Sequence, residues 1–178
     1  SPSPPKGVAA AWRRLREGLA YVKRQPAILG TLAITVIMNA WAFPFQAILP
    51  VIARDVLGQG PTGLGMLGAA SGVGGLAGLL LVNWGRERYS HEAIFAGGSL
   101  LGCVGLMGLS LSTSFPLSLT ALVVSGVGLA GFSIMQSSII LVEATDEMRS
   151  RAMGALVLAI GSGPLGRVQG GAMAVAWG

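Results

Sequence analysis

Charged residues are absent from four long stretches of this 178-residue chain, and each stretch is predominantly apolar. The stretches are residues 25–53, 56–85, 93–142 and 152–166. A helix needs about 20 apolar residues to cross the ~30 Å hydrocarbon core of a bilayer. The longest stretch has room for two such helices, separated by the polar sequence STSFP. The pattern therefore predicts five membrane spans, at about 27–52, 62–82, 92–111, 115–141 and 153–176.

These spans favour the α-helix over any other structure. Inside lipid every backbone N–H and C=O must be paired within the protein, which an open strand cannot achieve. A β-barrel would need short segments of alternating polarity, whereas these segments are long and continuously apolar. The sequence thus predicts an all-α, polytopic membrane protein, with the transmembrane half-bundle over residues 27–178.

The residues before the first span form two parts. Residues 1–7 are rich in proline and serine and are typical of a linker. Between residues 8 and 25, apolar positions recur at spacings of three and four, and basic residues occupy the other faces. The apolar positions are Val8, Trp12, Leu15, Leu19 and Val22. We expect an amphipathic helix on the cytoplasmic membrane surface; a helix packed on another loop would give the same pattern.

Composition agrees with a membrane protein and argues against a nucleic-acid partner. Only 11% of the residues are charged, against ~25% in soluble proteins, and the mean hydropathy is +0.69. The net charge is +5 and the pI is about 10.4. However, the basic residues flank apolar spans and do not form a stripe interleaved with aromatic residues.

The distribution of lysine and arginine predicts the orientation. If the spans alternate in direction, almost all basic residues outside the spans fall on one side of the membrane, and Arg54 falls on the other. The first group is Lys6, Arg13, Arg14, Arg16, Lys23, Arg24, Arg86, Arg88, Arg149 and Arg151. By the positive-inside rule this side is cytoplasmic. We therefore expect a multi-pass protein of the bacterial inner (plasma) membrane, with a cytoplasmic amino terminus.

Small residues recur four positions apart in the second span. This spacing lets helix backbones approach closely, which matters where lipid supplies no hydrophobic drive for association. The pairs are Gly68 with Gly72, Ser71 with Gly75, and Gly74 with Gly78. We expect this span to be wedged between protein neighbours, although glycine is also frequent in membrane helices generally.

Polar side chains inside two spans are candidates for a substrate cavity. Asn39, Phe43 and Gln46 share one face of the first span, and Phe132 and Gln136 share a face of the fourth. Two faces of amides and aromatic rings suit a cavity for a bulky, partly apolar solute. Hydrogen bonding between helices, without any contact to substrate, explains them equally well.

Arg167 is a charge within the fifth predicted span. An arginine at the bilayer centre costs about 2.5–3.5 kcal/mol even on insertion scales. It therefore faces a wet pathway, meets an acidic partner outside this chain, or extends toward the outer interface.

Catalytic and metal-binding patterns are missing from the sequence. It has one histidine, His91, and one cysteine, Cys103, and no HxxE, CxxC, GxSxG or P-loop spacing. We expect no enzyme activity, no cofactor and no bound metal.

Five sequence blocks together resemble the carboxy-terminal half of a major facilitator superfamily transporter. They are EGLAYVKRQPAILG (17–30), AFPFQAILPVIARDVLG (42–58), GLGMLGAASGVGGLAG (63–78), DEMRSRAMG (146–154) and GPLG (163–166). The chain is most similar to the bacterial drug- and siderophore-exporter group that includes enterobactin and macrolide exporters.

The resemblance implies a twelve-helix fold of two six-helix halves, with substrate near the bilayer midplane. The spans here would be the seventh to eleventh helices, of which the first and fourth line the cavity. The missing partners would be the amino-terminal half and the final helix. The implied function is alternating-access efflux of small amphipathic molecules such as drugs or siderophores. The alternative is a membrane scaffold or assembly subunit that transports nothing.

The connection between the fourth and fifth spans is densely charged. The resemblance places a cytoplasmic latch there, in which Asp146, Arg149 and Arg151 pair with neighbouring helix ends. The arginines would equally serve as topological anchors alone. Arg86 and Arg88 lie in the loop equivalent to the family's acidic–basic motif, which is degenerate here because it lacks its aspartate.

Overall fold

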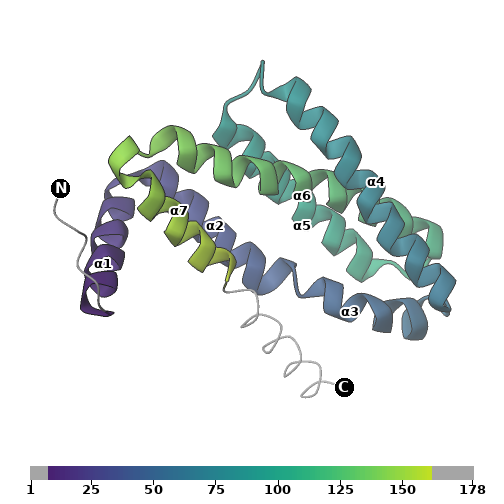
Figure 1. The fold of residues 1–178 in the computed structure, drawn as a ribbon. Coiled ribbons are helices and arrows are strands. Elements are labelled where there is room, and N and C mark those ends of the chain that lie inside the picture. Colours follow the sequence, from purple (N-terminus) through teal and green to yellow (C-terminus); the bar gives the residue numbers. More distant parts are fainter. Residues whose placement is uncertain (1–7, 162–178) are drawn as a thin grey trace.

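The computed structural model describes residues 8–161, with side chains from residue 16 onward (Figure 1). Every regular element in this part of the chain is helical. In chain order the helices are α1 (Val8–Arg24), α2 (Pro26–Ile37), α3 (Phe45–Val51), α4 (Pro61–Gly85), α5 (His91–Leu111), α6 (Phe115–Glu143) and α7 (Asp146–Ile160). Two π-helical turns, η1 (Met38–Ala42) and η2 (Ile52–Val56), follow α2 and α3 respectively. The predicted all-α class is confirmed over these residues.

Four helical segments are long and apolar enough to cross a membrane. They are Pro26–Val56, which runs from α2 to η2, and the helices α4, α5 and α6. Helix α7 enters the fifth predicted span, but the rest of that span, with Arg167, lies outside the described residues. The membrane-protein class is therefore confirmed with four candidate spans, and the fifth span stays a prediction.

Prolines determine where the first long segment begins and where it is interrupted. Pro26 occupies the first turn of α2, where a missing N–H costs nothing. Pro44 and Pro50 lie within the segment and lack the N–H that would continue the helical ladder. Beside Pro44 the ladder lengthens by one residue, because Phe43 N donates to Met38 O at 3.0 Å. The helix is consequently wider and irregular over η1.

Helix α6 is the centre of the bundle, and α4 and α5 each pack extensively on it. Glycines make this possible. A Cβ at Gly74 of α4 would overlap the Val123 carbonyl of α6, and one at Gly98 of α5 would lie 2.9 Å from Phe132 N. Helices α4 and α5 have little contact with one another. The backbones of α4 and α5 therefore each approach the α6 backbone closely, whereas α4 and α5 stay apart from one another.

A second core joins α1, α2 and α7 at the carboxyl end of α6. Its buried members include Val22, Ile28, Ile140, Ala152 and Leu156, each with 3% or less of its surface exposed. The connection from α6 to α7 is short, so α7 turns back beside α2 and close to α1 (Figure 1). This core fixes the charged connection 142–154 against the amino-terminal helix.

Candidate functional site

Thr35 links the polar side chains of α2, η1 and α6. Its hydroxyl is buried and lies 3.1 Å from Gln136 Oε1 and 2.8 Å from the carbonyl oxygen of Thr31. Its own carbonyl accepts a hydrogen bond of 2.9 Å from Asn39 Nδ2. Because the hydroxyl has one hydrogen, its bond to Gln136 competes with the bond to its own helix.

Three aromatic rings lie next to this polar junction. The Phe132 ring of α6 stacks on Phe95 of α5 at 5.4 Å between centroids, with 25° between the planes. Phe43, at the end of η1, also contacts Phe132, with 6.1 Å between the ring centroids and 50° between the planes. Phe132 is 1% exposed, whereas Phe43 is half-buried. Phe43 is therefore the most accessible of the three rings.

The five cavity candidates differ in exposure. Gln136 and Phe132 are buried, Asn39 and Phe43 are half-buried, and Gln46 is exposed on α3. The structure brings Asn39 together with Gln136 through Thr35, and Phe43 together with Phe132. Gln46 takes part in neither group. Asn39, Phe43 and Gln46 are thus at least partly accessible, whereas Phe132 and Gln136 are enclosed within the bundle.

Sequence reasoning missed Thr35. Its signal was present in the spacing of Thr31, Thr35 and Asn39, which recur every four residues along one face. Thr31 and Thr35 each bond the carbonyl four residues before them, which is an ordinary way for threonine to be satisfied in a helix. Nothing in that pattern indicates which threonine also reaches a neighbouring helix.

The three latch candidates form two different ion pairs, one within α7 and one between α7 and α1. Arg149 pairs with Asp146 one turn away in α7, at 2.9 Å, and both side chains are largely exposed. Arg151 instead reaches α1, where its Nη1 lies 3.0 Å from Glu17 Oε2. Among these pairs, only that of Arg151 joins two helices.

Of the four glycines proposed for helix packing, Gly78 lies against α6. A Cβ there would come within 2.6 Å of the Val127 carbonyl oxygen. The backbone of Gly75 meets Gly126 of α6, but a Cβ on Gly75 itself would point to open space. Gly68 and Gly72 are exposed and meet nothing within 4 Å among the described residues. The α4 face that packs inside this chain thus contains Gly74 and Gly78.

The family model of the Major Facilitator Superfamily matches residues 1–178. The chain belongs to the major facilitator superfamily. Comparisons with curated proteins and with solved structures found no match. Members of this superfamily are membrane transporters rather than enzymes, and the apolar helices agree with a multi-pass membrane protein. Superfamily membership therefore gives the activity class, while substrate and direction are matters for a proposal.

Proposed function

We propose that this chain is part of an alternating-access exporter that moves small amphipathic molecules, such as drugs or siderophores, out across the bacterial inner membrane. The observation that carries the proposal is the arrangement around η1. The half-buried Phe43 ring, at the end of a π-helical turn, contacts the buried Phe132 ring, and the Asn39 amide on that turn is linked to the buried Gln136 through Thr35. Aromatic rings with a few amide groups suit partly apolar solutes, and π-helical turns are frequent at functional sites.

In this proposal the outer residues touch substrate and the inner ones position them. Asn39, Phe43 and Gln46 face the central cavity between the two halves. Phe132 supports the Phe43 ring, and Gln136 ties α6 to α2 through Thr35. The exposed glycines Gly68 and Gly72 of α4 provide a close-packing face for the amino-terminal six-helix half.

The amino terminus and the connection before α7 lie on the cytoplasmic side in this proposal, because basic residues gather there. The pair between Glu17 and Arg151 holds α1 against α7 in one of the two access states. Movement of α7 during the transport cycle breaks the pair and frees α1.

The test is export of ethidium, a fluorescent amphipathic cation, by the full-length protein in cells that lack their own exporters. Phe43→Ala should lower the export rate roughly five- to tenfold, which corresponds to loss of one aromatic contact. Asn39→Ala should change the apparent affinity for ethidium more than the maximal rate, because it alters contact with the ground state.

The matched control is Trp41→Ala. Trp41 is a large, exposed aromatic residue in the same π-helical turn, two positions from both Asn39 and Phe43 and so on roughly the opposite side. It should leave export unchanged at equal protein level. Export that depends on Trp41 but not on Phe43 would show that the cavity lies on the Trp41 side of the turn. Export unaffected by all three changes would favour the scaffold function.

A further inference from the structure

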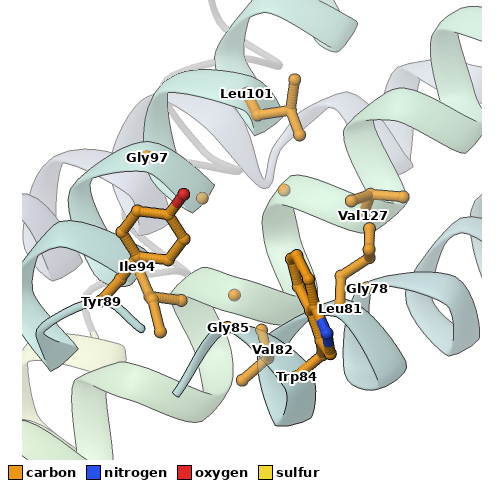
Figure 2. Close-up of a pocket in the computed structure, with 13 residues that line it drawn as sticks. Gly78, Leu81, Val82, Trp84, Gly85, Tyr89, Ile94, Gly97, Leu101 and Val127 are labelled. Carbon is orange, nitrogen blue, oxygen red and sulfur yellow. The ribbon is translucent and has the colours of Figure 1, made fainter. Parts of the chain in front are cut away.

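An apolar groove of about 240 Å³ runs between α4 and α5, with α6 as its floor (Figure 2). It exists because α4 and α5 each pack on glycines of α6 and leave a gap between themselves. From the connecting loop it extends to Gly78 on α4 and to Leu101 on α5. These distances are about two helical turns, or roughly 10 Å, along α4 and nearly three turns, or roughly 15 Å, along α5. Its dimensions and apolar lining fit part of a hydrocarbon chain.

Aromatic rings flank the loop end of the groove. Figure 2 shows Trp84 and Tyr89 on opposite sides of it, from the end of α4 and from the loop that follows. Both side chains are exposed, by 58% and 61%. Tryptophan and tyrosine concentrate where the hydrocarbon core meets the lipid headgroups, since one end of each ring system is apolar and the other polar. The loop end of the groove thus has the character of a headgroup-level position.

A cation is fixed at the same place. The Arg88 guanidinium lies 4.2 Å from the centroid of the Trp84 ring. Stacking on an indole leaves the N–H groups at the edge of the guanidinium available, and these donors match phosphate oxygens. Arg86 adds a second exposed positive charge, and the carboxylate of Glu87 offsets one of the two. Glu92 lies in the first turn of α5, where the positive end of the helix dipole balances its charge. Arg88 is therefore the group that can select a headgroup.

We infer that this groove binds an anionic phospholipid, with one acyl chain between α4 and α5 and its phosphate on Arg88. Basic sites between transmembrane helices on the cytoplasmic side are suited to anionic headgroups. The groove is an annular lipid site and is separate from the proposed transport cavity around η1. The site does not depend on the substrate or the direction of transport.

The experiment is lipid-selective quenching of Trp84 fluorescence in reconstituted full-length protein, with every other tryptophan replaced by phenylalanine. Vesicles of phosphatidylcholine contain a fixed fraction of either brominated phosphatidylglycerol or brominated phosphatidylcholine, because bromine on an acyl chain quenches a nearby indole. We expect phosphatidylglycerol to quench more strongly. Arg88→Gln should lower the ratio of the two association constants roughly fivefold, while Arg88→Lys, which keeps the charge, should retain most of it.

A groove-filling variant tests the acyl-chain part separately. Gly97 lines the groove, and a Cβ there would meet nothing within 4 Å. Gly97→Leu should therefore fold normally and reduce quenching by both brominated lipids. Gly30→Leu, on α2 and equally open, is the control and should change nothing.

Three results would overturn the inference. Equal quenching by the two brominated lipids in the unmodified protein would remove the selectivity. An unchanged ratio in Arg88→Gln would remove the role of that residue. Weak quenching by both lipids, unaffected by Gly97→Leu, would show that a protein segment covers the groove instead.

Discussion

Arg151 at the start of α7 and Glu17 of α1 form an ion pair, with 3.0 Å between Nη1 and Oε2. Two neighbouring contacts support it. The Tyr21 hydroxyl accepts a hydrogen bond of 3.2 Å from Thr145 N, and a Cβ on Gly18 would lie 3.5 Å from Arg151 Cβ. The amphipathic helix is therefore docked on the charged connection at close range, rather than only lying near it.

Reversing the charge in Glu17→Arg should loosen the contact between α1 and α7 around this pair, while the buried core keeps α1 attached. Both side chains of the pair are more than a third exposed, so the free energy of unfolding should change by less than about 1 kcal/mol. The geometry should change more, because two arginines then face each other. Pulsed electron paramagnetic resonance between spin labels at the exposed positions Ala20 and Ser150 should show a longer and broader distance distribution.

Two variants control this measurement. The double exchange Glu17→Arg with Arg151→Glu should restore the original distribution, since the pair is re-formed with opposite polarity. Arg149→Glu should leave the distribution unchanged, because Arg149 pairs within α7. An equal effect of Arg149→Glu and Glu17→Arg would mean that the overall charge of the connection matters, rather than the specific pair.

Gly74→Ala should destabilise the bundle by about 1–3 kcal/mol or more, because the added Cβ would overlap the Val123 backbone, which cannot move aside as a flexible side chain can. The measurement is the free energy of unfolding in mixed micelles. Gly65→Ala is the matched control on the same helix. Its Cβ meets open space, and alanine is the better helix former, so stability should stay equal or rise. Equal losses in both variants would show that the α4–α6 contact is not limiting.

The glycine pattern shows how far the sequence predicts this fold. Charge-free stretches indicate apolar helices, because a membrane span must lack charge over its whole length. They do not indicate which face of a helix meets a neighbour, since lipid-facing and protein-facing positions are both apolar. Gly68 with Gly72 and Gly74 with Gly78 have the same spacing in the sequence, and only the second pair lies on α6.

The candidate site was predictable to a similar extent. Amides and aromatic residues within spans are rare enough to be noticed, and four of the five candidates fall into two contacting groups. The sequence could not separate the exposed Gln46 from the buried Gln136, because burial depends on how α2 and α3 pack on α6. Nor could it pair Arg151 with Glu17, which are far apart in the chain and meet only because α7 turns back beside α1.

Two serines of α6 should respond to alanine with opposite signs. Ser125 and Ser118 are both fully buried. The Ser125 hydroxyl has no hydrogen-bond partner among the described residues, whereas the Ser118 hydroxyl donates to Ser112 Oγ at 3.0 Å. Since an unsatisfied buried hydroxyl is unfavourable, Ser125→Ala should raise the free energy of unfolding by about 1 kcal/mol, and Ser118→Ala should lower it by a similar amount.

The same unfolding measurement in mixed micelles decides this prediction. The two substitutions remove the same atom from the same helix, so differences in helix propensity cancel. A loss of stability in Ser125→Ala as large as that in Ser118→Ala would show that the Ser125 hydroxyl is bonded in the membrane-embedded protein.

Pro44→Ala should make the protein more stable and at the same time lower its export of ethidium. Pro44 is buried beside η1, and its ring prevents the ladder from closing in the ordinary way. Alanine restores an N–H that can bond the Ala40 carbonyl, so the free energy of unfolding should rise by up to about 3 kcal/mol. A regular helix would also rotate Phe43, whose ring now lies 6.1 Å from Phe132. Ethidium export should therefore fall although the protein is more stable.

Pro50→Ala is the control for this trade-off. Pro50 is exposed and lies within α3, beyond Gln46 and away from the Phe43 contact. Its removal should also stabilise the segment, but export should fall less than in Pro44→Ala, since Asn39 and Phe43 keep their places and only Gln46 lies nearby. If Pro44→Ala leaves export intact, the π-helical turn has no part in the site. If Pro44→Ala lowers the free energy of unfolding, the π-helical turn η1 is maintained by side-chain packing and not by the missing N–H of Pro44.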